Sequence, residues 1–287
     1  MHVRKLVKAG PSSHTVSLPK EWLLQHKLGK GSTVFMHERE NGLVIMSDPS
    51  ARPEQREKTI TIDKKDVATL GRELTSAYIN NYSTIRFTGD VQTHAKELRK
   101  LLRDFAGLEI VEQSTTALVA QDLLNLKEVS IEKTLRRMDM TVRSMFQDCK
   151  NPALAESVTL RDYDMNRMYF LLYRLLKGSL RDPIVAQHVQ LSTDKVLASW
   201  VLANTFENLG DSLKQFAGKK SPMFAELEKL YLDAVKASFT NDKALADAVA
   251  GRREELVASL KGESGDILRT MATYIVDIAR AVIDADS

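Results

Sequence analysis

The sequence predicts a multidomain α+β protein, with a small β-module, a short α/β connector and a long all-helical C-terminal half. Three observations support this. Short runs with a period of two residues fill the first 50 positions, strand-like and helix-like runs alternate from residue 58 to 121, and helical periodicity continues from Leu123 to the end. A chain of 287 residues is also long enough for more than one domain.

The first predicted domain spans residues 1–48 and consists of short strands around one small helix. An opening strand over residues 3–7 is followed by a Gly-Pro-Ser-Ser break, and residues 14–18 alternate polar and apolar side chains. Pro19 suits the first turn of a helix over residues 20–27. A hairpin follows, with strands over residues 32–37 and 43–46 and a turn at Asn41-Gly42. About fifty residues bury too little surface to be stable alone, so we expect this domain to dimerise.

A linker over residues 49–57, rich in Pro and polar residues, leads to a predicted connector domain over residues 58–121. The connector's order is strand, helix, strand, helix, strand, strand. We expect Asp66 to cap the first helix and Thr93 to cap the second, which would end at Gly107.

Residues 122–287 are predicted to be helical throughout. Breaks such as Asn151-Pro152, Asp182-Pro183 and Thr240-Asn241 divide this half into six segments, and the first three are about 25 residues long. Two sets of three, over residues 122–218 and 222–287, indicate an internal duplication and two tandem three-helix bundles. An apolar stripe at three- and four-residue spacing on the second segment is expected to be core; it comprises Met165, Met168, Tyr169, Leu172, Leu175 and Leu176.

Composition suits a folded protein, with 43% hydrophobic and 28% charged residues. The single cysteine, Cys149, is expected to be buried in a helix and is compatible with a reducing compartment. The most apolar run, residues 168–176, is too short to span a bilayer and is interrupted by Arg174, so we expect a cytoplasmic protein without membrane insertion.

Basic charge is concentrated at the N-terminus. The chain has a net charge of +3, yet six cations face one acid, Glu21, within the first thirty residues. Lys and Arg side chains gain affinity for nucleic acids by releasing counterions from phosphates. We predict that phosphate or base-edge contacts come from Arg4, Lys5, Lys8 and Lys20, supported by Ser12, Ser13 and His14. The alternative is that these charges only solvate a small β-surface. Trp22 is expected to anchor the small core rather than stack on a base.

The string from Arg4 to Trp22, which contains Gly10-Pro11-Ser12-Ser13 and ends in Leu18-Pro19-Lys20-Glu21-Trp22, resembles the swapped-hairpin module of the AbrB and SpoVT family. The later run over residues 28–34 resembles that family's turn into its second hairpin. The resemblance covers residues 1–48 and implies a homodimer that interlaces its hairpins and lays a basic face on double-stranded DNA. Relatives of this module also act as antitoxins or as plain dimerisation units.

The helical half carries two polar pairs at a spacing of four residues, Asp162 with Asn166 and Glu207 with Asp211. Side chains four apart share one helix face, so antiparallel neighbours would bring these oxygens together. Such a site would suit Mg²⁺, Mn²⁺ or iron rather than a thiolate metal. The alternative is that these are exposed polar helix faces.

The runs over residues 160–171 and 206–211 resemble the paired motifs of the PhoU proteins, which fold as two tandem three-helix bundles that can hold metal. With the N-terminal module, the whole chain resembles an archaeal class of phosphate-uptake regulators. Two departures weaken the metal motifs. Asn166 stands where that family usually has Asp, and Arg269 and Thr273 stand where a second acidic pair is expected. We therefore expect no required cofactor, and no second metal site.

Three functions follow as hypotheses. The first is a DNA-binding transcriptional regulator, of phosphate uptake by the resemblance, whose helical half senses a signal. The second is an adaptor that docks on the ATPase of a phosphate transporter and uses its N-terminal module only to dimerise. The third, a metal-dependent hydrolase or oxidase, ranks last because the chain has no nucleophile elbow, Walker loop or HExxH motif. We therefore predict that the protein is not an enzyme.

Overall fold

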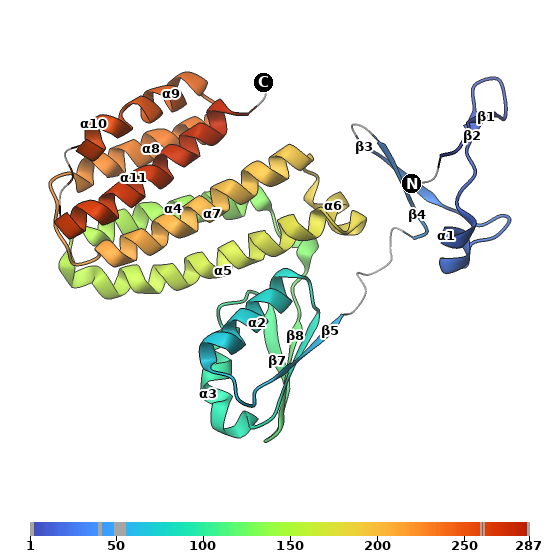
Figure 1. Cartoon of the computed structure of the whole chain (residues 1–287), viewed down its shortest axis with the longest axis horizontal. Helices are drawn as coiled ribbons and strands as arrows, with labels where there is room; N and C mark the ends of the chain where they lie inside the picture. Colours follow the sequence, from blue (N-terminus) through green and yellow to red (C-terminus); the bar gives the residue numbers. More distant parts are fainter. Residues whose placement is uncertain (1–2, 40–41, 49–55, 259, 261, 286–287) are drawn as a thin grey trace. The chain divides into compact units, whose positions relative to one another are not determined.

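The computed structural model of the chain describes residues 3–39, 42–48, 56–258, 260 and 262–285. The chain divides into two compact units, residues 1–54 and residues 55–287 (Figure 1). Their boundary falls inside the linker predicted over residues 49–57. The connector and the helical half, which the sequence separates by pattern, pack together within the second unit.

Unit 1 contains two separate two-stranded antiparallel sheets and one short helix. Its elements are β1 (Val7–Lys8), β2 (His14–Thr15), α1 (Lys20–Gln25), β3 (Phe35–Arg39) and β4 (Gly42–Met46). The predicted second hairpin is present, with Arg39 paired to Gly42, while Asn41 of its predicted turn lies outside the described residues. Pro19 precedes the helix as its N-cap rather than lying in its first turn.

The first hairpin of unit 1 is much shorter than the alternation of residues predicts. Strands were expected over residues 3–7 and 14–18, but only Val7 with Thr15 and Lys8 with His14 are paired. The reason is that a strand needs a neighbour to satisfy its backbone groups, and the single chain provides one only over these two pairs.

The described residues of unit 1 form no hydrophobic core of their own. None of its residues within 3–39 and 42–48 whose exposure is described is buried. Leu6 is 71% exposed and Leu24 67% exposed, and Met36 is similarly open. Trp22, the predicted core anchor, is only partly buried, and its ring lies 4.9 Å from that of His26.

The connector in unit 2 is a four-stranded sheet with two helices, in the predicted order. Its elements are β5 (Glu57–Thr61), α2 (Val67–Ile79), β6 (Thr84–Thr88), α3 (Val91–Leu102), β7 (Leu108–Gln113) and β8 (Ala117–Asp122). The strand order in the sheet is β5-β6-β8-β7, parallel between β5 and β6 and antiparallel elsewhere. Alternate strand residues meet the apolar faces of the helices in one buried cluster, which includes Ile60, Ile85, Phe87, Leu118, Leu70, Leu74, Tyr78 and Leu98.

Helix capping in the connector agrees with the prediction at one helix and differs at the other. Asp66 caps α2 and accepts a hydrogen bond from the Thr69 amide at 2.7 Å. The cap of α3 is Asp90 instead of the predicted Thr93, whose own amide donates to the Asp90 carboxylate at 3.1 Å. The helix therefore starts earlier than predicted, and it also ends earlier, at Leu102 rather than near Gly107.

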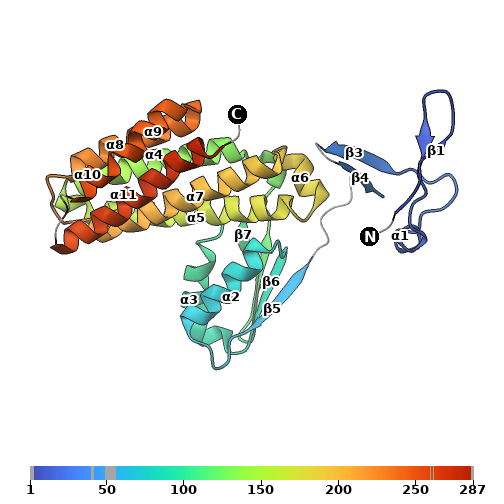
Figure 2. The same ribbon diagram turned by 45° about the horizontal axis from the view of Figure 1, so that its top comes forward.

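The helical region consists mainly of long helices that pack side by side, next to the connector (Figure 2). Its elements are η1 (Leu126–Glu128), α4 (Ile131–Cys149), η2 (Pro152–Leu154), α5 (Ala155–Ser179), α6 (Pro183–Val189), α7 (Thr193–Phe216), α8 (Phe224–Thr240), α9 (Lys243–Gly251), α10 (Arg253–Ala258) and α11 (Gly262–Ile283). Two of the six predicted segments are divided further. The third becomes α6 and α7 because Gln190 adopts a left-handed conformation, and the fifth becomes α9 and α10 at Arg252.

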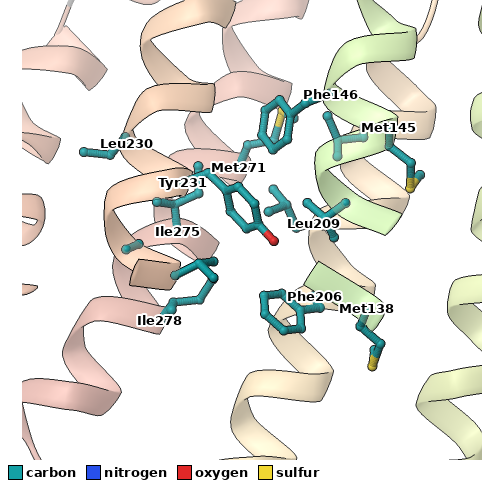
Figure 3. Close-up of a cluster of buried hydrophobic side chains, with 14 of the residues drawn as sticks. Met138, Met145, Phe146, Phe206, Leu209, Leu230, Tyr231, Met271, Ile275 and Ile278 are labelled. Atoms are coloured by element: carbon teal, nitrogen blue, oxygen red, sulfur yellow. The ribbon is translucent and has the colours of Figure 1, made fainter. Parts of the chain in front are cut away.

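One continuous hydrophobic cluster runs through both predicted sets of three helices. Figure 3 shows its centre, where Phe146 of α4, Phe206 and Leu209 of α7, Tyr231 of α8 and Met271 of α11 converge. All five side chains are at most 1% exposed. The two sets therefore share their core instead of burying separate ones.

A buried polar group links the two sets inside this core. The Tyr231 hydroxyl donates to the Asp139 carboxylate at 2.8 Å, and Arg143 pairs with the same carboxylate at 2.8 Å. Burial, together with the negative charge of Asp139, raises the pKa of Tyr231, which keeps the hydroxyl protonated as a donor. Helices α4 and α8 are thus held in a defined register by a satisfied polar contact.

Helix α5 joins the helical region to the connector through a buried arginine. Arg174 is 3% exposed, forms an ion pair with Asp122 at the end of β8 and donates to the Asn81 side chain at 2.6 Å. Its guanidinium also lies 4.8 Å from the centre of the Tyr78 ring. Gly178 makes room for this contact, because a Cβ there would lie 2.6 Å from the Asn81 amide nitrogen.

Among the described residues, no helix is long and apolar enough to cross a membrane.

Candidate functional site

The four cations predicted to contact DNA all lie exposed on unit 1. Arg4 and Lys5 precede β1, Lys8 lies in β1, and Lys20 is the first residue of α1. Within the described part of the chain, none of the four forms an ion pair, and Arg4 makes only a hydrogen bond to the neighbouring Val3 carbonyl. Their charges are therefore not neutralised by any acid that the structure describes and are available to an outside polyanion.

The three supporting residues lie together in the loop and second strand of the first hairpin. Ser12 and Ser13 are exposed in the bend, and the Ser13 carbonyl accepts a hydrogen bond from the Ala9 amide at 2.9 Å. His14 pairs with Lys8 across the two strands. Because directly opposite residues point to the same side of a sheet, Lys8 and His14 share one face of the hairpin.

The structure brings some of the predicted residues together and leaves others apart. Lys8, Ser12, Ser13 and His14 belong to one hairpin, whereas Arg4 and Lys5 lie on the approach to it and Lys20 follows it on α1. No hydrogen bond joins these three groups to one another in the described residues of unit 1. A single protomer therefore provides exposed cations along one short segment rather than a closed pocket.

Two further cations, Lys27 and Lys30, are exposed on the turn after α1 and were not assigned to the site from the sequence. The turn is closed by a hydrogen bond from the Gly29 amide to the Ser32 hydroxyl oxygen at 2.9 Å, and Lys27 adopts a positive φ of 54°. Their charge was visible in the composition of the first thirty residues, and their position on a surface turn adds them to the exposed basic set.

Three of the four predicted metal residues, Asp162 on α5 and Glu207 and Asp211 on α7, lie near one another and near Lys214. Asp162 is buried, and its carboxylate lies 2.6 Å from the ammonium of Lys214. Burial, with the nearby charges of Asp211 and Asp162, raises the pKa of Glu207 to about 7. Burial and Asp162 also raise the pKa of Asp211. These shifts are those expected for acids that crowd one another in a partly dry place.

This cluster does not fit a metal ion in its present arrangement. The ammonium of Lys214 takes the position beside Asp162 that a cation would need, and Asn166 lines a different hollow together with Asp104 of the connector. Over the described residues, no three His, Cys, Asp or Glu side chains are placed so that they would hold a metal. The metal site stays a prediction from the sequence.

The positions where a second acidic pair would stand are bound within the protein. Arg269 pairs with Asp266 and donates to the Leu260 carbonyl at 2.6 Å. The Thr273 hydroxyl donates to the Arg269 carbonyl and accepts a hydrogen bond from Arg253. These groups hold α10 and α11 together and offer no cluster of oxygen ligands.

Comparison with known proteins identifies a relative for the N-terminal module only. Residues 7–59 match the family described as antidote-toxin recognition MazE, bacterial antitoxin. This match covers unit 1 from Val7 onward and the first residues of β5, so Arg4 and Lys5 lie outside it, and it supports the assignment of the N-terminal module to the AbrB type. No curated protein and no solved structure matches the chain. The resemblance of the helical half to PhoU thus rests on the sequence motifs alone.

Proposed function

We propose that the protein is a homodimeric DNA-binding transcriptional regulator in which unit 1 binds DNA and unit 2 acts as a sensor or protein-interaction domain. One observation carries this proposal most directly. Unit 1 presents exposed cations that form no ion pair among the described residues, within a module that matches an AbrB-type family. Cations without an ion pair in the protein can neutralise phosphates directly, and the counterions that are then released from the DNA contribute to affinity.

The exposed apolar side chains of unit 1 support dimerisation. Leu6, Leu24 and Met36 are each at least 64% exposed, although all three are large and hydrophobic. Large apolar side chains left exposed on a small module whose described residues include no buried one are expected where a partner covers them. A second copy whose hairpins interlace with the first would cover these side chains and would lengthen the two-residue strands by supplying their missing neighbours.

The dimer would double the number of cations offered to one duplex. Lys8 and His14 share a hairpin face with the Ser12 and Ser13 loop nearby, so each protomer would present the same set by symmetry. The serine hydroxyls and free loop amides would fix the position of the protein on the phosphate backbone, while Arg4 and Lys5 reach base edges or phosphates.

The connector is suited to pass a signal from the helical region toward unit 1. Arg56, which lies in the linker directly before β5, donates to the Asn80 carbonyl at 3.1 Å, and its guanidinium lies 4.4 Å from the centre of the Tyr82 ring. Asn81, between these two, is held by Arg174 of α5. A movement of α5 would therefore act on the segment that anchors the end of the linker.

DNA binding is tested with the full-length protein by fluorescence anisotropy at several salt concentrations. The double variant R4A/K8A should lose about tenfold in affinity for each phosphate contact removed at low salt, with a shallower dependence on salt. Lys96→Ala, an exposed lysine of α3 without an ion pair in the described structure, is the matched control and should leave both quantities unchanged. Equal affinity of the double variant and the wild type would overturn the proposal.

The regulated pathway is proposed from the PhoU resemblance, which points to phosphate uptake. Genome-wide occupancy of the protein should then change between high- and low-phosphate cultures. Occupancy that is the same in both would remove phosphate from the proposal and leave the regulator intact. If phosphate-dependent regulation instead survives the R4A/K8A substitutions, the adaptor that docks on a transporter ATPase is the better description.

The family match favours a second candidate, an antitoxin role, because the matched family is described as recognising a toxin. In that case unit 1 would bind a small toxin protein. Loss of the gene would leave that toxin unbound, and the toxin would then arrest growth. Affinity purification from the native cell, before and after nuclease treatment, separates the two. A stoichiometric protein partner that persists without DNA would favour the antitoxin.

A further inference from the structure

We propose that a groove between the connector and helix α5 binds a small zwitterion with an apolar side chain, of the class of the apolar α-amino acids. The groove would be the site through which unit 2 receives its signal, so its regulatory meaning rests on the proposed function. The binding itself does not depend on DNA and is measured separately.

The groove has a volume of about 520 Å³, within the range typical of small-molecule sites. Its lining comes from three elements: α2, the end of α3 with the turn after it, and α5. The apolar part of the lining includes Gly71, Ile79, Leu101, Phe105 and Phe170. The rings of Phe105 and Phe170 lie 5.2 Å apart and form an aromatic wall. Gly71 leaves room for the Leu101 side chain, because a Cβ at this position would lie 3.3 Å from it.

Two opposite charges border the same groove. Arg72 of α2 is exposed, and its guanidinium donates to the Thr69 hydroxyl one turn earlier. Asp104 follows α3 and is partly buried. Neither forms an ion pair with a residue in the described part of the chain. Lys100 and Arg167 act on Asp104 from nearby, but neither lines the groove.

A zwitterion suits this lining better than a simple acid or amine. Its carboxylate would pair with the guanidinium of Arg72, which presents several donors in one plane. Its ammonium would meet the Asp104 carboxylate and the side-chain oxygen of Asn166. The apolar side chain would lie against Phe105 and Phe170. An acid alone would leave the Asp104 carboxylate without a charge partner inside the groove, and an amine alone would leave the Arg72 guanidinium without one.

The groove lies beside the junction that joins α5 to the connector. Ile79 lines the groove and is two residues before Asn81, while Phe170 lines it and is one helical turn before Arg174. A bound molecule would therefore touch both helices, α2 and α5, close to their buried ionic contact. A ligand that favours one packing of these helices over another would shift the equilibrium between the two.

The test is isothermal titration calorimetry of the full-length protein with L-leucine, L-methionine and L-phenylalanine. At least one should bind in the micromolar to millimolar range. Its decarboxylated amine and its deaminated acid should each bind at least tenfold more weakly, because each loses one charge contact. No binding by any of the three amino acids, or equal binding by an amine or acid analogue, would overturn the proposal.

Variants locate the site. Arg72→Gln and Asp104→Asn should each weaken binding about tenfold or more, whereas Arg103→Gln, an exposed neighbour outside the lining, should bind as the wild type does. Circular dichroism confirms that each variant is folded. If both groove variants bind normally, the site lies elsewhere and this assignment is wrong. A protein that binds the amino acid but no DNA would instead overturn the proposed function and leave the groove assignment standing.

Discussion

Units 1 and 2 of the chain differ sharply in how they treat their apolar residues. Unit 2 buries large side chains completely, in one cluster within the connector and one within the helices. Unit 1 buries none of its residues within 3–39 and 42–48 whose exposure is described, although it contains strands, a helix and many apolar side chains. A unit of this kind owes its stability to association, whereas unit 2 has the interior of an independently folding domain.

The largest effect is expected from a substitution in the exposed apolar surface of unit 1. Leu6→Asp should abolish the dimer, because a charge would enter the surface that the second copy covers. Light scattering should then show the 32.2 kDa chain mass instead of twice that value. DNA affinity should fall by about 100-fold, since the contacts of one subunit are lost.

Leu197 of α7 provides the matched control, because it is 61% exposed on unit 2 and should not lie in that interface. Leu197→Asp is expected to keep both the mass and the DNA affinity. A Leu6→Asp protein that remains dimeric would show that unit 1 does not carry the association.

The next effect concerns the buried junction inside unit 2. Arg174→Ala should reduce the free energy of unfolding by about 3–5 kcal/mol, because it leaves the buried Asp122 carboxylate without its partner. Urea unfolding measures the change. Arg181→Ala removes an exposed hydrogen bond to Asn80 and should cost below about 1 kcal/mol. Similar losses in the two variants would contradict the role assigned to the junction.

A smaller effect is expected from the polar contact in the shared helical core. Tyr231→Phe should lower the free energy of unfolding by about 1–2 kcal/mol, because Asp139 loses a buried donor but keeps Arg143. The measurement is again urea unfolding, with Tyr274→Phe on α11 as a control that should change stability by less than about 0.5 kcal/mol. A larger loss in the control would place the important hydroxyl elsewhere.

A pH dependence of unit 2 is a further expected effect. The pKa of Glu207 is raised from its usual 4.5 to about 7, so between these values the folded protein holds a proton that the unfolded chain releases. Stability should therefore fall as the pH rises through this window, and Glu207→Gln should remove that part of the fall. Carboxyl NMR titration should give a midpoint near pH 7. A midpoint at the ordinary glutamate value would show that the cluster is fully solvated.

The connector shows how much of the fold could be predicted from the sequence. Period-two runs around Ile60, Ile85 and Leu118 gave the right strands, and Asp66 marked the right helix start. The Asp90 cap was missed because Asp90 and Thr93 are both good capping residues three positions apart. The division of α6 from α7 was missed because it depends on Gln190 in a left-handed conformation. Glycine is the usual residue in that conformation, and the sequence has none at this position.

The site was predictable in its residue types more than in its arrangement. The basic segment of unit 1 is visible from composition, but the strands over residues 3–7 and 14–18 need neighbours that one chain does not contain. In the helical half, the spacing of Glu207 and Asp211 indicated one helix face. The same spacing rule places Lys214 three residues beyond Asp211, and its ammonium changes a set of metal ligands into an internal ion pair.

The shared core of the two helix sets has a consequence for how this protein would be degraded. Residues 218–222 look like a natural cutting point between two repeats, but Phe206 and Tyr231 on either side of it lie in one interior. A protease that cleaves there would leave two fragments that stay associated while folded, and neither would survive alone as a half-sized domain. The two helix sets, which the sequence predicts as a duplication, therefore form one cooperative folding unit, and we expect them to unfold and be degraded together.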